Sequence, residues 1–121
     1  MKQSVMVVDD SPTIRKFVSI SLTMRGFDVV VCADGMEAIE KLPDKKIDLV
    51  ITDLNMPNLD GYELIKAIRN NEEYKETPII ILSSLAGSEE IDRGMECGAN
   101  SYLVKPFDPK KIQYEVAKYL S

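Results

Sequence analysis

The chain has 121 residues, the size of one ordinary domain, and its 45% hydrophobic and 29% charged residues are typical of a folded globular protein. Its 15 basic and 20 acidic residues give a net charge of -5 without forming a basic stripe, so nucleic acid is not expected as a direct partner. The sequence lacks an apolar run long enough to cross a membrane, and we expect no signal peptide. We therefore expect residues 1–121 to form a single domain of a cytoplasmic protein that does not insert into membranes.

Residue types that are rare or absent limit the chemistry further. Histidine is absent, which removes the commonest general base and the commonest metal ligand. Cys32 and Cys97 lie far apart in apolar surroundings, so we expect two reduced thiols and not a metal or redox motif. Any chemistry must therefore use carboxylates, hydroxyls and lysine.

Five short runs with the composition of β-strands alternate with segments of helical periodicity. The central runs are apolar throughout, which is typical of a parallel sheet covered on both faces. The sequence therefore predicts a doubly wound, three-layer α/β sandwich, in which ligands bind beyond the carboxyl ends of the strands. The expected strands are residues 4–8, 28–32, 48–52, 78–82 and 101–104.

Side chains that can cap a first turn mark the starts of four helices. Ser11 precedes a proline, and Asp34, Asp60 and Asp108 open the second, third and fifth helices. Asp34 and Asp60 are each followed three residues later by a glutamate, which is the spacing of a capping box.

The fourth helix, expected over residues 88–97, has weaker signals. Ile91 and Met95 are its main apolar anchors, and Gly94 in its interior costs about 1 kcal/mol relative to alanine. We expect it to be the loosest helix of the fold.

Polar side chains follow the carboxyl ends of four predicted strands. They are Asp9 with Asp10, then Asp53, Ser83 and Lys105. Each one alone fits a turn, a cap or a solvated loop residue. Three acids, a hydroxyl and a lysine at one sheet edge together indicate a functional site.

Mutual repulsion constrains the chemistry of three acids in one place. Two carboxylates about 4 Å apart repel by about 4 kcal/mol at an effective dielectric of about 20, so a cation is expected among them. Carboxylate, carbonyl and water oxygens are the ligands that a magnesium ion (Mg2+) prefers. Asp53 is then placed to attack phosphorus without a general base, while Ser83 and Lys105 hold phosphoryl oxygens.

Four motifs lie at these strand ends: V-V-D-D-S at residues 7–11, D-L-N-M-P-N-L-D-G at 53–61, L-S-S at 82–84 and V-K-P-F at 104–107. With them, the sequence resembles the receiver domain of two-component response regulators, of the free-standing CheY-like chemotaxis type. The resemblance covers the whole chain. It implies a flavodoxin-like fold with a five-stranded parallel sheet in the order 2-1-3-4-5 and five helices.

The resemblance also implies roles for the acidic residues. Asp53 matches the phosphoacceptor, and Asp9 and Asp10 match the family's acidic pair. The expected metal site comprises these three residues and Asn55, whose backbone carbonyl would be a ligand of Mg2+.

Further positions match the family's switch. Ser83 matches the switch hydroxyl, Tyr102 the aromatic switch residue and Lys105 the invariant lysine, with a cis peptide expected between Lys105 and Pro106. Phosphorylation is then expected to reshape the surface formed by the fourth helix, fifth strand and fifth helix. A histidine kinase or phosphotransfer protein is the expected donor, and a downstream protein the expected target. The domain would be a signalling protein and not an enzyme acting on an external substrate.

Three alternatives remain open on the sequence. An aspartate-dependent phosphohydrolase would carry an acid two residues after its nucleophile, where this chain has Asn55. A nucleotide or flavin carrier would use a glycine-rich first turn, where this chain has D-D-S-P-T. A receiver-like adaptor that is never phosphorylated would look the same in sequence.

Overall fold

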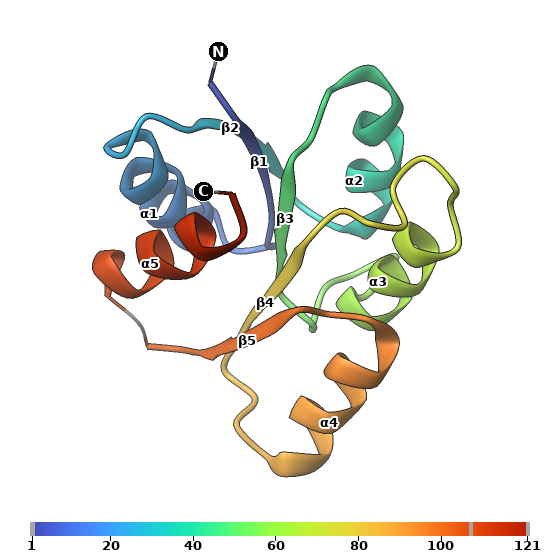
Figure 1. The fold of residues 1–121 in the computed structure, drawn as a ribbon. Helices are drawn as coiled ribbons and strands as arrows, with labels where there is room; N and C mark the ends of the chain where they lie inside the picture. Colours follow the sequence, from blue (N-terminus) through green and yellow to red (C-terminus); the bar gives the residue numbers. More distant parts are fainter. Residues whose placement is uncertain (1, 107, 121) are drawn as a thin grey trace.

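The structure, a computed structural model, describes residues 2–106 and 108–120. Their strands form one parallel sheet in the order β2-β1-β3-β4-β5 (Figure 1). This confirms the flavodoxin-like three-layer sandwich. The strands are β1 (Ser4–Val8), β2 (Asp28–Cys32), β3 (Leu49–Thr52), β4 (Ile79–Ser83) and β5 (Ser101–Val104).

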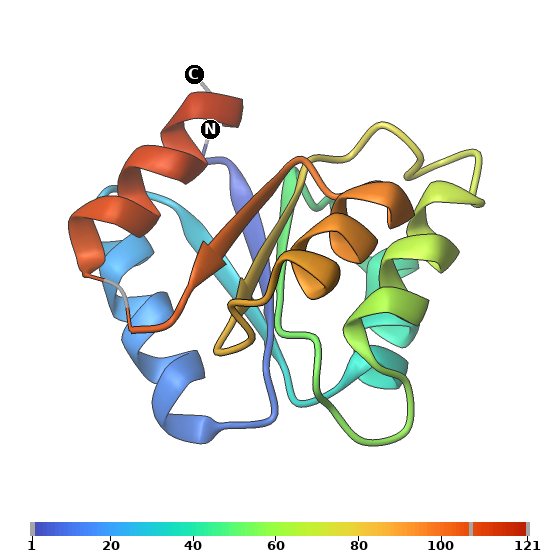
Figure 2. The same ribbon diagram turned by 90° about the horizontal axis from the view of Figure 1, so that it is seen from below.

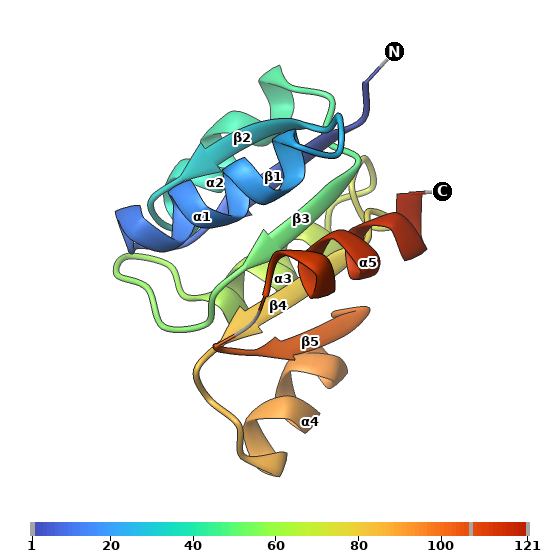
Figure 3. The same cartoon turned by 90° about the vertical axis from the view of Figure 1, so that its left-hand side faces the viewer.

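Helices cover both faces of the sheet. Helices α1 and α5 lie on one face and α2, α3 and α4 on the other (Figures 2 and 3). Buried side chains alternate between the two layers along each strand: on β1, Val5 and Val7 join the α1–α5 core, whereas Met6 and Val8 join the α2–α3 core. The helices are α1 (Pro12–Thr23), α2 (Gly35–Lys41), α3 (Gly61–Arg69), α4 (Ser88–Cys97) and α5 (Pro109–Leu120), and a 3-10 turn (Leu42–Asp44) follows α2.

Three boundaries, in two strands, each differ from the prediction by one residue. Strand β3 begins at Leu49, because the side chain of Asp48 takes the place of a main-chain acceptor and binds the Ser4 N–H at 2.8 Å. Strand β4 begins after Pro78, which has no N–H to donate to the ladder. It extends to Ser83, whose carbonyl accepts from the Lys105 N–H at 2.8 Å.

The predicted helix caps form, with one difference. Ser11 caps α1 through the Ile14 N–H at 3.3 Å, and Asp60 forms a complete capping box with the glutamate three residues later. Asp34 accepts from the Glu37 N–H at 2.9 Å. The glutamate carboxylate, however, accepts from the N–H of residue 33 at 2.7 Å, one residue before the position that a capping box requires.

Helix α4 is anchored differently from the prediction. Gly94 is the one residue of this fully described helix that is buried, and Met95, predicted as an anchor, is 41% exposed. The Met95 prediction is wrong because the helix approaches the sheet through the glycine. A Cβ atom on Gly94 would lie 2.5 Å from Ile81 Cδ1 and 3.6 Å from the Tyr102 ring. The glycine thus permits a close approach, and the looseness of α4 stays a prediction.

Tyr62 of α3 provides a second anchor for α4. Its hydroxyl donates to the Glu90 carbonyl at 3.3 Å, and the Arg93 guanidinium lies 3.9 Å from the centre of its ring. A hydrogen bond and a cation–π contact therefore hold α4 against α3, where the helix offers few buried apolar side chains.

Two further findings concern the helices and the thiols. None of the helices described is both long and apolar enough to span a membrane. Cys32 is buried, Cys97 is partly buried, and both are free thiols.

Candidate functional site

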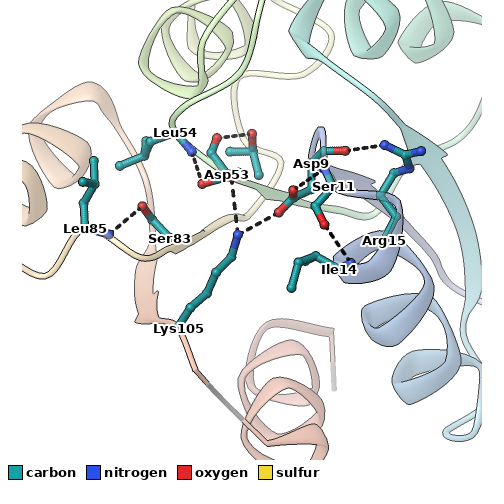
Figure 4. A network of polar contacts seen from close by, with 10 residues as sticks. Asp9, Ser11, Ile14, Arg15, Asp53, Leu54, Ser83, Leu85 and Lys105 are labelled. Carbon is teal, nitrogen blue, oxygen red and sulfur yellow. Dashed lines mark hydrogen bonds and ion pairs between the residues drawn. The ribbon is translucent and has the colours of Figure 1, made fainter.

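The carboxyl ends of β1, β3, β4 and β5 meet at one edge of the sheet (Figure 4). Asp9 follows β1, Asp53 follows β3, Ser83 ends β4 and Lys105 follows β5. The geometry thus brings the strand-end residues to one place, as the sequence predicted, and joins three of them directly.

Lys105 bridges the two buried acids. Its Nζ lies 3.0 Å from Asp9 Oδ2 and 3.4 Å from Asp53 Oδ2. The side chains of Asp9 and Asp53 are only 3% and 11% exposed, so water screens this cluster weakly. The ammonium group therefore offsets the repulsion between the two carboxylates.

Asp53 is held by main-chain groups of β1 and of the residue that follows it. Its N–H donates to the Val8 carbonyl at 2.9 Å, and its Oδ1 accepts from the Leu54 N–H at 2.7 Å. Burial raises the pKa of the Asp53 carboxyl, and the charge of Asp9 raises it further. The Leu54 N–H and Lys105 act in the opposite direction. The ionised carboxylate is therefore an energetically costly group that favours an additional cation.

Asp9 is fixed by four hydrogen bonds. Its Oδ1 accepts from the Ser11 N–H at 2.9 Å, and its N–H donates to the Cys32 carbonyl at 3.1 Å. Its own carbonyl accepts from Arg15 Nη1 at 2.7 Å. Its remaining oxygen, Oδ2, receives Lys105, so the orientation of this carboxylate is set before any ligand arrives.

The three acids are close enough to share a cation. One carboxylate oxygen from each of Asp9, Asp10 and Asp53 lies within 4.8 Å of the other two. Asp10 is exposed, whereas Asp9 is buried, so the cluster opens to solvent on one side. Oxygen donors alone, on a partly open cluster, suit magnesium better than a soft metal. Asn55 lies exposed in the loop after Asp53, and its part in this site stays a prediction.

Ser83 and Tyr102 both form hydrogen bonds with the main chain of Leu85. The Ser83 hydroxyl accepts from the Leu85 N–H at 3.1 Å, and the Tyr102 hydroxyl donates to the Leu85 carbonyl at 2.6 Å. Burial raises the pKa of Tyr102, which the Ser83 hydroxyl partly opposes. Both predicted switch residues therefore contact the loop that leads into α4.

Residues that the sequence reasoning did not single out complete the site. The buried Thr52 hydroxyl donates to the Asp53 carbonyl at 2.8 Å. A Cβ atom on Gly61 would overlap the same carbonyl oxygen, so this position leaves no room for a side chain. The D-G pair at residues 60–61 is a sequence signal for a turn at which the main chain passes this close to another segment. Nothing in the sequence indicates the hydrogen bond from Arg15 to the Asp9 carbonyl.

The backbone after β5 also agrees with the resemblance, because the Lys105–Pro106 peptide bond is cis.

Comparisons with known proteins agree with this architecture. The sequence pattern that describes the response regulator receiver domain matches residues 5–117. Protein PilG of Pseudomonas aeruginosa is 40% identical over 108 residues, which cover 89% of this chain and 80% of PilG. The probable transcriptional regulator ycf27 of Guillardia theta is 39% identical over 98% of this chain but over only 46% of its own length, so the chain spans about half of that relative.

Solved structures give the same result. Chemotaxis protein CheY4 of Vibrio cholerae has a TM-score of 0.93 and 38% identity, over 98% of this chain and 99% of that one. The receiver domain of the sensor histidine kinase PA1611 of Pseudomonas aeruginosa, which has a magnesium ion coordinated in its active-site cleft, has a TM-score of 0.91 and 28% identity. That similarity covers 99% of this chain and 98% of the PA1611 domain.

Proposed function

The chain belongs to the family of response regulator receiver domains, and from this premise we propose that Asp53 accepts a phosphoryl group in a two-component signalling pathway. The observation that carries the proposal is the buried pair of acids, Asp9 and Asp53, bridged by Lys105 at the edge of the sheet. Members of this family are signalling proteins, and the relationship to chemotaxis protein CheY4 supports a chemotaxis-type pathway.

The proposed reaction needs no general base. A carboxylate oxygen of Asp53 forms a bond to phosphorus while the bond between phosphorus and the donor breaks, and the donor's leaving group takes the electron pair. The proposed donor is the phosphohistidine of a histidine kinase or phosphotransfer protein, whose imidazole nitrogen is that leaving group. Lys105, already 3.4 Å from Asp53, is placed to bind an oxygen of the incoming group.

The donor set fits a magnesium ion. Asp9, Asp10 and Asp53 bring three carboxylate oxygens within 4.8 Å of one another, and we propose that they hold Mg2+ together with the Asn55 backbone carbonyl. The magnesium in the similar PA1611 domain supports this assignment. When bound, the ion would neutralise the carboxylates and the phosphoryl oxygens during transfer.

The proposed output is a change at the surface of α4, β5 and α5 that a downstream protein recognises. Ser83 and Tyr102 support this, because both hold the Leu85 peptide units at the entrance to α4. A hydroxyl of Ser83 that turns to a phosphoryl oxygen gives up its bond to the Leu85 N–H, which shifts the population of loop and helix arrangements. A cytoplasmic location belongs to the same proposal.

Intact-mass measurement tests the proposal. After incubation with Mg2+ and acetyl phosphate, the wild type should gain one phosphoryl group, whereas Asp53→Asn should gain none. Asp60→Asn is the matched control, because asparagine also caps a helix and the site is unchanged, so this variant should be phosphorylated like the wild type. If the wild type gains no phosphoryl group, the adaptor that is never phosphorylated is favoured. If Asp53→Asn gains one, the acceptor is another residue.

A further inference from the structure

A groove of about 340 Å³ lies between the turn that follows α1 and one face of α5. Both helices cover the same face of the sheet, on the side that faces the viewer in Figure 3. The groove has no residue in common with the acidic site. Its volume lies at the lower end of the range for small-molecule sites. The residues that line it are Arg25, Phe27, Lys110, Gln113, Tyr114 and Ala117.

The two walls of the groove are regular and fixed. On α5, the lining residues are spaced at i, i+3, i+4 and i+7 from Lys110, so they share one helix face. On the other side, Gly26 adopts a φ of +86°, and the N–H groups of Arg25 and Phe27 both donate to the Leu22 carbonyl. The position of both walls is therefore set by backbone structure.

A buried amide orients the cationic end of the groove. Gln113, only 8% exposed, donates to the Ser21 carbonyl at 2.7 Å and accepts from Arg25 Nε at 3.2 Å. This bond engages the Nε of the guanidinium and leaves the donors of its two Nη groups for another partner.

The groove carries positive charge that none of the described acidic residues neutralises. In residues 2–106 and 108–120, neither Arg25 nor Lys110 forms an ion pair, and no described lining residue is acidic. The nearest acids in sequence are engaged elsewhere: Asp28 pairs with a lysine at 4.0 Å, and Asp108 accepts from the Lys111 N–H at 2.8 Å. A protein with a net charge of -5 thus places two unpaired cations at one apolar groove.

Aromatic surface lies beside these cations. The Tyr114 ring is 68% exposed, and Phe27 forms the opposite wall while packing on the α1–α5 core. Ala117, one turn beyond Tyr114, leaves the space between the walls open.

We propose that this groove binds a small amphiphilic anion: an aromatic or aliphatic ring system that carries one carboxylate or phosphate group. The anionic group binds Arg25 and Lys110, and the ring packs between Phe27 and Tyr114. Charge complementarity selects the anion, and the small volume selects a compact molecule over an extended protein segment. The proposal does not depend on phosphorylation of Asp53, because none of the lining residues belongs to that site.

A titration monitored by amide NMR tests the proposal on the full chain, with 2-naphthoate as the probe and uncharged 2-naphthalenemethanol as its matched analogue. We expect 2-naphthoate to shift the amides of residues 25–27 and 113–117 with millimolar affinity. We expect the uncharged analogue to bind at least about fivefold more weakly, because it lacks the carboxylate that pairs with Arg25 and Lys110. Equal affinities, or no shifts at these amides, would overturn the proposal.

Substitutions test which side chains contribute to binding. Arg25→Gln and Lys110→Gln should each weaken binding by about two- to fivefold. Lys66→Gln, the same charge change at an exposed position of α3, should leave binding unchanged. Tyr114→Ala should weaken binding and Tyr114→Phe should restore it, with little risk to folding because the ring is exposed. An equal loss of affinity in Lys66→Gln would show that only the net charge of the protein matters, and it would refute the site. A glutamate-rich peptide that shifts these amides when 2-naphthoate does not would refute the small ligand in favour of a protein partner.

Discussion

Replacing Lys105 with methionine should lower the free energy of unfolding at neutral pH by about 3–5 kcal/mol. The lysine lies 3.0 Å from Asp9 and 3.4 Å from Asp53, distances at which each attraction is about 5 kcal/mol at an effective dielectric of about 20. Desolvation of the three groups cancels part of that attraction in the wild type. The variant keeps the desolvated carboxylates and loses their cation, which is why the expected loss is large. Methionine retains most of the aliphatic stem, so the packing contribution should be small.

The pH dependence of this loss follows from the raised pKa of Asp53. A carboxyl whose pKa is higher in the folded than in the unfolded chain destabilises the fold where it is ionised. This penalty shrinks once the pH falls below the folded pKa and is gone below the unfolded pKa. Without Lys105, that pKa should rise further. The difference between variant and wild type should therefore shrink on acidification.

Urea unfolding followed by far-ultraviolet circular dichroism measures the effect, because the chain has no tryptophan. Added Mg2+ should recover part of the loss by supplying a cation to the same carboxylates. The double variant Lys105→Met, Asp53→Asn should be more stable than Lys105→Met alone. Lys66→Met, at an exposed position, should change stability by less than about 0.5 kcal/mol. The lysine would not offset two buried charges if Lys105→Met lowered the free energy of unfolding by less than about 1 kcal/mol, with the slope of that free energy against urea concentration unchanged.

Four further outcomes are expected from the same structure. Asp53→Asn should unfold at higher urea than the wild type at neutral pH, and this gain should shrink as the pH falls below the folded pKa of Asp53 and vanish below the pKa of an unfolded aspartate; an unchanged midpoint at neutral pH would contradict the burial argument. Cys32, whose pKa burial raises to about 11, should react with iodoacetamide at pH about 8 on the order of a hundredfold more slowly than in urea-unfolded chain; equal rates would show that it is accessible. Gly94→Ala should destabilise by about 1–3 kcal/mol in urea unfolding despite its better helix propensity, because the new methyl would lie 2.5 Å from a β4 side chain; a stabilised variant would mean that α4 moves away freely. Tyr62→Phe should speed amide exchange in α4 by about two- to tenfold while the cation–π contact remains; unchanged exchange would exclude the hydroxyl bond to Glu90 as an anchor.

The sheet and the composition of its functional edge could be predicted because they depend on local patterns. Alternating strands and helices define a parallel sheet, and a parallel sheet has one edge at which all carboxyl ends meet. Asp9, Asp53 and Lys105 therefore had to converge, although they are 96 residues apart at the extremes. The cap at Asp60 was predictable for the same reason, since both of its partners lie within one turn.

What the sequence did not reveal depends on distances between elements. Met95 has the spacing of a core residue, but the separation of α4 from the sheet decides which side chain is buried, and Gly94 takes that place. The bond from Arg15 to the Asp9 carbonyl depends on how a long side chain folds back over a strand end, which no periodicity encodes. Ser83 was expected at the phosphoryl site, yet its described bond is to the Leu85 N–H.

The position of Leu85 explains how a reaction at the sheet edge can reach a helix with little buried surface. Its N–H is bound by Ser83 and its carbonyl by Tyr102, so two residues from neighbouring strands hold one stretch of loop. Under the proposed function, a Ser83 hydroxyl that turns toward Asp53 leaves the Leu85 N–H without its acceptor, at a cost of about 1–3 kcal/mol where that group is shielded from water. Movement of the loop removes this cost. Helix α4 begins three residues later and buries only Gly94 along its described length, so we expect it to follow that movement.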